Sequence, residues 1–319
     1  MKHTRKITSI LILMFVLTQL IGLLVIYAYT PLIEQVEING TLQNQTLNPL
    51  PYGLESPDVE QDISLISIII AFAIAVGILF VLTKFRAAII LKIWFFIVTI
   101  LVLAITFVAF EHLVPWQIPY KIAMIAPLAI ALPLAIFKIF KRNLIVHNFT
   151  ELLIYPGIAS VFVPLLGLGS IIILLILISL YDMWAVWHSG FMQKMAKFQM
   201  EELKVFTGFF VPYLSKSQRK KLKKLKQESN LKKTSKKPVN MKVNLAILGG
   251  GDIVFPIITA GIILRLWGLI PALLVITFAT LALLGLFSIS KKGKFYPAMP
   301  FISAGLFVGI ILGYLFTLI

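Results

Sequence analysis

Two aspartates, Asp182 and Asp252, lie inside long apolar stretches, in the segments ISLYDMWAV and AILGGGDIVFP. We interpret them as the only carboxylates clearly embedded in a membrane, where each costs about 2.5–3.5 kcal/mol on insertion scales and usually faces a partner or water. Neither stretch holds a lysine or arginine that could neutralise its aspartate. Two such acids could share a proton, activate a water molecule and protonate a leaving group. They could also carry protons or cations across the bilayer.

The composition predicts a polytopic, all-α membrane protein. Hydrophobic residues make up 59% of the 319 residues, and the mean hydropathy is +0.97. This exceeds what a soluble core uses. The chain has no cysteine, which excludes disulfides, thiolate catalysis and cysteine-ligated metal. Its histidines are scattered without metal-ligand spacing, so we expect neither a metal nor another cofactor; they are His3, His112, His147 and His188.

Nine apolar stretches are each about long enough to cross a hydrocarbon core of about 30 Å. The predicted spans are residues 7–29, 63–83, 88–110, 120–137, 150–167, 169–188, 243–264, 267–289 and 296–318. The weakest division separates the fifth span from the sixth, at residues 166–170. A single span there would leave eight helices and move the C-terminus to the other side.

The distribution of basic residues predicts the orientation. Of the 29 lysines and arginines, only Lys121 and Arg265 fall on the side opposite to the N-terminus, and the acidic first loop, residues 30–62, holds none. The positive-inside rule then places the N-terminus in the cytoplasm and the C-terminus outside the cell. The first apolar run is longer than the core of a signal peptide, so we expect it to be retained as a helix.

Three regions follow from this topology. Residues 1–188 hold helices one to six with the acidic outer loop, residues 189–242 form a basic cytoplasmic loop, and residues 243–319 hold helices seven to nine. We expect the loop to be largely disordered and close to anionic lipid, although residues 191–214 could form an amphipathic helix in the interface. The net charge of +16 does not indicate nucleic acid, because no aromatic platform accompanies it.

Three glycosylation sequons begin at Asn39, Asn44 and Asn148. The first two lie in the outer loop, where glycosylation is chemically reasonable. The sequon at Asn148 falls on the inner side, where it has no such meaning.

The predicted topology brings the two aspartates to the same depth. Asp182 lies about six residues before the inner end of its span and Asp252 about nine after the inner start of the next, or roughly 9–14 Å deep at 1.5 Å per residue. Consecutive spans are antiparallel, so the two side chains can meet. Gly249, Gly250 and Gly251 disfavour a helix interior and allow close approach of a ligand, or of another helix through a small-residue pair with Ala246.

Two further features accompany the aspartates. Tyr181 could donate a hydrogen bond near the site or simply pack. Pro297 and Pro300 suppress regular hydrogen bonding where the ninth span begins, at the same membrane level. Irregular backbone at that depth is tolerated only against protein or water.

Tyr181-Asp182, Gly249-Gly250-Gly251-Asp252 and Pro297-Ala298-Met299 together resemble the YD, GxGD and PAL motifs of the presenilin and signal peptide peptidase family of intramembrane aspartyl proteases, most closely its archaeal members. The resemblance implies that Asp182 and Asp252 are catalytic. It also implies that substrate contacts come from the remaining motif residues: Tyr181, Gly249, Gly250, Gly251, Pro297, Ala298 and Met299.

The resemblance further implies transmembrane or signal-peptide substrates, which unwind locally and pair as a strand near the GxGD and PAL segments. Two positions depart from the family pattern. Met299 stands in place of leucine, a volume-conserving change. Gly250 stands where a side chain is common, which bears on substrate preference.

Two other functions remain open from the residues alone. A prepilin-type peptidase also carries GxGD but should cut leader peptides on the soluble side. A proton- or cation-coupled transporter also uses paired acids, although we find no inverted repeat of the kind many transporters show. The chain is expected in the cell membrane, in contact with lipid and without nucleic acid, and the sequence leaves a homo-oligomer open.

Overall fold

The computed structural model describes residues 5–30, 33–38, 41–46, 50–53, 88–114, 119–141, 143–189, 207–213, 244–290 and 296–318, with isolated positions between 66 and 78. Helices dominate this part of the chain. They are α1 (Arg5–Ala28), α3 (Ala88–His112), α4 (Tyr120–Ile139), α5 (Leu144–Phe162), α6 (Leu168–Trp184), α9 (Gly251–Trp267), α10 (Leu269–Ile289) and α11 (Met299–Thr317).

Seven helical segments in the described residues are long and apolar enough to cross a membrane. The helix α9, at 17 residues, is not among these seven segments. The second predicted span, 63–83, falls mostly outside the described residues, and its few described positions are helical and exposed. Many large apolar side chains on the helices are exposed, as lipid contact requires.

The fifth and sixth predicted spans are separate helices. The helix α5 continues into a short 3-10 turn, Val163–Leu165, and the backbone is extended at Leu166 and Gly167 before α6 begins. The fifth helix starts at Leu144, earlier than the predicted residue 150. Its first turn is stabilised by Asn143, whose side chain accepts a hydrogen bond from the Ile145 N–H.

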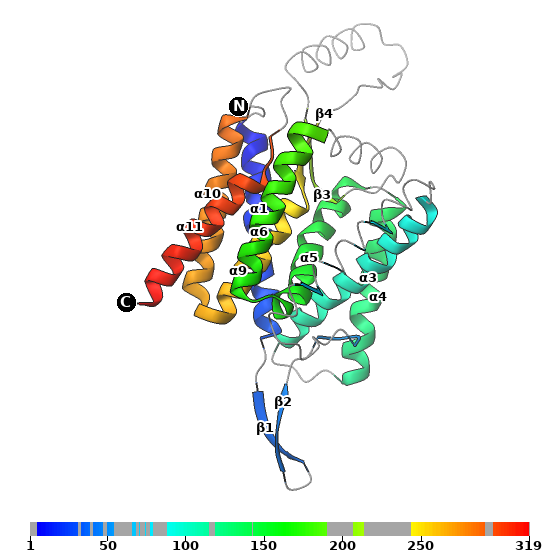
Figure 1. The fold of residues 1–319 in the computed structure, drawn as a ribbon. Coiled ribbons are helices and arrows are strands. Elements are labelled where there is room, and N and C mark those ends of the chain that lie inside the picture. Colours follow the sequence, from blue (N-terminus) through cyan, green and yellow to red (C-terminus); the bar gives the residue numbers. More distant parts are fainter. Residues whose placement is uncertain are drawn as a thin grey trace, which may run out of the picture.

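Figure 1 shows α10 and α11 on one flank of the bundle and α3 and α4 on the other, with α1, α5, α6 and α9 between them. A hairpin of β1 (Ile33–Ile38) and β2 (Thr41–Thr46) projects from one end. The start of α1 and a second hairpin, of β3 (Gly208–Tyr213) and β4 (Asn244–Gly249), lie at the opposite end.

The second hairpin corrects two predictions. Residues 244–249 form a strand, so the seventh span is not a helix from residue 243. Residues 208–213 form the partner strand, not the end of an interfacial helix, and residues 191–206 and 214 lie outside the described part. The physical reason is burial of one strand face in the main core through alternate residues, as a strand requires: Phe209, Val211, Ala246 and Leu248.

The helices α10 and α11 pack closely through glycines on α11. A Cβ atom at Gly305 would lie 2.5 Å from the Phe278 carbonyl oxygen, and one at Gly309 would lie 2.6 Å from the Val275 Cα. Glycine at four-residue spacing lets two helix backbones approach, and packing drives association where lipid offers no hydrophobic gain. This pair positions the N-terminus of α11 beside α6.

Candidate active site

Asp182 lies near the end of α6, followed by a single π-helical turn, Ala185–Ser189. Its side chain is buried, and its Oδ2 accepts a hydrogen bond of 3.0 Å from the Met299 N–H. Met299 is the first residue of α11, so this N–H has no partner within its own helix. One turn away, the hydroxyl groups of Ser179 and Ser303 are 2.9 Å apart and join the same two helices.

Asp252 lies in the first turn of α9, directly after β4. Gly250 is the N-cap of α9 and Gly251 its first residue. The three glycines therefore form a strand-to-helix junction, and the expectation that they lie in a helix interior is wrong. Their low helix propensity costs little at such a junction, because Gly249 belongs to β4, Gly250 is the N-cap, and only Gly251 lies within α9.

The two carboxylates lie on helices that contact each other, Asp182 on α6 and Asp252 on α9. Asp182 is bonded to the N-terminus of α11, and Asp252 sits in the first turn of α9, so each lies at the positive end of a helix dipole. Each helix dipole favours the ionised form of its carboxyl group. Such an acid pair can activate water and protonate a leaving group.

The glycine junction is closely packed around Asp252. A Cβ atom at Gly249 would lie 3.2 Å from the Asp252 Oδ2, and one at Gly250 would lie 2.9 Å from the Tyr155 hydroxyl oxygen. At Gly251 the nearest atom would be 3.9 Å away, an ordinary contact. Packing therefore explains why glycine occupies the variable position of GxGD. Tyr155 of α5 fills the space that a side chain at Gly250 would need.

A second buried side chain approaches the same turn of α9. The Gln19 side chain of α1 donates a hydrogen bond of 3.0 Å to the carbonyl oxygen of Ile253, next to Asp252. Gln19 is fully buried. Pro256 has no N–H to donate to the Asp252 carbonyl, so regular bonding is weakened here. Sequence reasoning missed Gln19, because one amide in an apolar helix gives no positional signal.

The other predicted site residues occupy different surroundings. The Tyr181 ring is 51% exposed and packs at a tilt against Trp184, with 6.4 Å between ring centroids. Pro297 and Ala298 precede α11 directly. The Met299 side chain is buried in the main core, while its backbone N–H holds Asp182.

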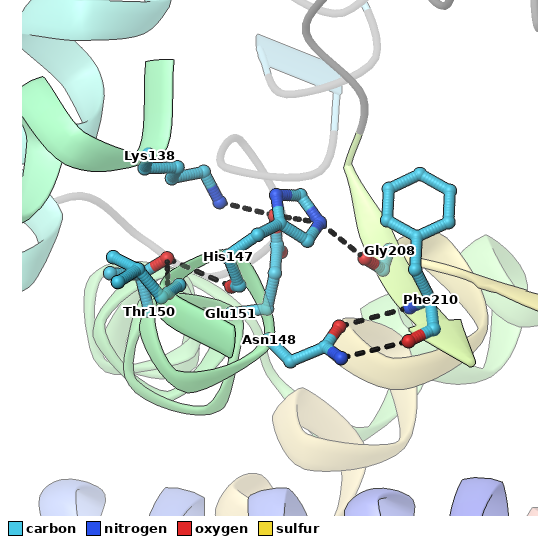
Figure 2. A network of polar contacts seen from close by, with 8 residues as sticks. Lys138, His147, Asn148, Thr150, Glu151, Gly208 and Phe210 are labelled. Atoms are coloured by element: carbon cyan, nitrogen blue, oxygen red, sulfur yellow. Dashed lines mark hydrogen bonds and ion pairs between the residues drawn. The ribbon is translucent and has the colours of Figure 1, made fainter. Parts of the chain in front are cut away.

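A third carboxylate inside an apolar helix corrects the expectation that only two exist. Glu151 of α5 is fully buried and forms an ion pair with Lys138 of α4, which is also buried (Figure 2). The Glu151 Oε1 is 3.6 Å from the Nε2 of His147. The spacing of His147, Glu151 and Tyr155 by four residues places them on one helix face, and this pattern could have revealed the cluster.

The same face of α5 contacts the second hairpin. The His147 Nε2 is 2.8 Å from the Gly208 carbonyl oxygen, and the Asn148 side chain bonds both backbone groups of Phe210 (Figure 2). From the sequence, Asn148 is only a sequon without meaning on the inner side. In the structure its side-chain amide contacts β3.

Comparison with known proteins now decides the family. The model of the family described as signal-peptide peptidase, presenilin aspartyl protease matches residues 40–319. The chain belongs to this family. It is an intramembrane aspartyl protease, and the enzyme class expected from the three motifs is confirmed.

Solved structures of a presenilin family intramembrane aspartate protease are similar to this protease in fold. One crystal form has a TM-score of 0.59 and 17% sequence identity, covering 97% of this chain and 99% of the other. A second form has a TM-score of 0.57 and 18% identity, with 96% of each chain covered. No curated protein matches the sequence. The protease is a multi-pass membrane protein, and the transporter alternative is not favoured.

Proposed function

We propose that Asp182 and Asp252 are the catalytic pair of this protease, and that it hydrolyses peptide bonds within transmembrane segments or signal peptides. The observation that carries the proposal is that each carboxylate, on one of two contacting helices, lies at the N-terminus of a helix. The Met299 N–H holds Asp182, and the glycine junction holds Asp252. In this proposal all three motifs of the family are structural parts of one site.

The chemistry needs one proton shared between the two acids. The ionised acid takes a proton from water, and the oxygen of that water attacks the scissile carbonyl. The protonated acid gives its proton to the carbonyl oxygen, which forms a tetrahedral intermediate. The acid that took the proton from water then gives it to the leaving nitrogen, and a hydroxyl group of the intermediate returns a proton to the other acid as the C–N bond breaks. No cofactor takes part in these steps.

Among the described strands β4 pairs with β3 alone, so its other edge is available to an unwound substrate. Phe210 directs its N–H and carbonyl toward Asn148, so alternate residues of β3 face away from β4. Pro212 follows the same alternation and has no N–H, as is usual at an edge. The register then turns the backbone groups of Leu245, Ile247 and Gly249 to the free side of β4.

A substrate strand would therefore add to β4 and not to β3. The Ile247 side chain is 37% exposed, in keeping with an uncovered edge. Strand addition satisfies the backbone groups that unwinding sets free, which is obligatory in a membrane. From Gly249 the chain reaches Asp252 within three residues, so a strand on this edge delivers its backbone to the acids. This places the predicted substrate contacts of Gly249 and its neighbours on the backbone.

We further propose that the protease spans the cell membrane nine times, with its N-terminus and basic loop in the cytoplasm. The charge distribution supports this orientation. The start of α1 and the second hairpin lie at one end of the bundle, which would be the cytoplasmic end (Figure 1).

The proposal is tested with purified protein and a model transmembrane peptide, with products mapped by mass. We expect Asp182→Asn and Asp252→Asn each to abolish cleavage while thermal unfolding stays near that of the wild type. An aspartyl-protease transition-state inhibitor should block the wild type. Glu111→Gln is the matched control, because Glu111 lies at the far end of α3, and it should cleave normally.

Near-wild-type cleavage by either aspartate variant would refute the catalytic pair. Cleavage confined to soluble leader peptides would instead support a prepilin-type peptidase.

A further inference from the structure

The outer edge of β3 is occupied by side chains of α5 and not by another strand. The Asn148 Oδ1 accepts a hydrogen bond of 3.0 Å from the Phe210 N–H, and its Nδ2 donates one of 2.8 Å to the Phe210 carbonyl oxygen. The Gly208 carbonyl oxygen, two residues back on the same edge, is 2.8 Å from the His147 Nε2 (Figure 2). Two consecutive side chains thus bind two consecutive outward positions of the strand.

Asn148 reproduces the bonding of a neighbouring strand. A side-chain amide carries donors and an acceptor side by side, which matches the N–H and carbonyl of one strand residue. Phe210 is buried, so both of its backbone groups need these partners. The strand can shift along α5 only by breaking both bonds. A shift that restores the alternation moves the chain by two residues, about 6.6 Å.

The same helix also holds the hairpin at the end nearest Asp252. Tyr155 lies two turns after Asn148 on α5. Its ring meets that of Phe209 edge to face, at 5.9 Å between centroids, and its hydroxyl lies against the Cα position of Gly250. The helix α5 therefore contacts both β3 and the junction that leads into α9.

The anchoring residues are themselves fixed to a neighbouring helix. His147 lies beside Glu151, which is ion-paired with Lys138 of α4. Because these charged groups are buried, they must stay paired, and α5 keeps one position relative to α4. The hairpin is thus fixed to a rigid pair of helices.

We propose that Asn148 is a positioning residue that sets which substrate peptide bond reaches Asp182 and Asp252. The inference rests on the proposed function, in which the substrate strand pairs with β4. The position of β4 relative to the acids follows from its pairing with β3, and that of β3 follows from Asn148. If β3 shifts or loosens, neighbouring bonds of the substrate reach the acids while the acids themselves remain intact.

The test compares the cleavage-site distribution of Asn148→Leu with that of the wild type. Leucine is nearly isosteric with asparagine but makes neither hydrogen bond. We expect the ratio of secondary to principal products to rise about three- to tenfold, the effect of losing one or two hydrogen bonds. Binding of a transition-state inhibitor should stay within about twofold of wild type, because the acids are unchanged.

Two further variants keep the test decisive. Asn143→Leu is the matched control, since Asn143 caps the same helix from an exposed position and does not contact β3; it should keep the wild-type product pattern. Asn148→Ser retains one bonding group in a smaller side chain and should show an intermediate ratio even if the leucine variant folds poorly.

An unchanged product pattern in both Asn148 variants, with activity lost only in proportion to unfolded protein, would overturn the inference. An equal change in Asn143→Leu would also overturn it, since the effect would then reflect helix stability alone. Absence of cleavage by the wild type would instead refute the proposed function, so the two failures are distinguishable.

Discussion

At the scale of residues, the two adjacent glycines before Asp252 differ in how much space they leave for a side chain. Gly250→Ala brings a Cβ to 2.9 Å from the Tyr155 hydroxyl, whereas Gly251→Ala meets nothing nearer than 3.9 Å. We expect Gly250→Ala to lower kcat/KM by about 10- to 100-fold, because a displacement of about 1 Å has this effect on positioned groups. Gly251→Ala should stay within about threefold. Steady-state cleavage of the model peptide measures both.

Tyr155→Phe supplies the control for this prediction. It removes the nearest of the clashing atoms, so the double variant Gly250→Ala, Tyr155→Phe should recover part of the lost activity. Equal losses in the two glycine variants would show that backbone freedom, and not the space filled by Tyr155, explains the glycines.

The two aspartates and their motifs could be predicted as site residues from the sequence. A charged group in an apolar span is costly and therefore rare, so it is easily recognised in the sequence alone. It did not predict Glu151 as buried, since this residue lies at the edge of its predicted span and its partner Lys138 was read as part of a loop. Asn148 was missed for another reason. Its role depends on a strand more than 60 residues away, and no local pattern encodes that contact.

At the scale of elements, the ion pair between α4 and α5 should be coupled in its effect on stability. We expect Glu151→Leu to lower the free energy of unfolding by about 3–5 kcal/mol, because it leaves the buried Lys138 charge unpaired. The double variant Lys138→Met, Glu151→Leu should recover most of this loss. Thermal unfolding in detergent gives both values. Additive losses in the double variant would contradict the coupling.

The contact between α10 and α11 allows a test with opposite signs. Gly309→Ala places a Cβ 2.6 Å from the Val275 Cα, and forcing the helices apart should cost about 1–3 kcal/mol. Gly285→Ala, in α10, meets nothing within 4 Å and should be neutral or stabilising by up to about 1 kcal/mol through helix propensity. Thermal unfolding of both variants measures the difference, and a loss of equal size in each would refute the packing argument.

Helix positions were predictable because runs of apolar residues have the length of a membrane span. The second hairpin was not, because residues 245–249 are apolar throughout and such a run fits a buried helix equally well. The strand conformation of this hairpin is favoured over a helix by contacts of β3 with α5 and of both strands with the main core. These contacts form only in the folded chain. The helix α9 is correspondingly shorter than the span predicted at that position.

At the scale of the whole molecule, the orientation can be tested directly because the chain has no cysteine. Single cysteines at Gln43, Ser229 and Thr317 can be labelled with an impermeant thiol reagent. With nine spans and a cytoplasmic N-terminus, intact cells should be labelled at residues 43 and 317, and residue 229 only after lysis. Labelling of 229 together with 317 in intact cells would contradict the topology.

The hydrogen bond between Met299 and Asp182 joins residues 117 positions apart in the chain. During synthesis α6 leaves the ribosome long before α11 is made. The interval is longer for Gln19 of α1, whose hydrogen-bond partner is the Ile253 carbonyl of α9. The proposed acid pair thus lacks its partner, the Met299 N–H, until α11 has been translated and inserted. A protease without α11 would be harmless to the nascent membrane proteins around it, and activity would begin only when α11 is in place.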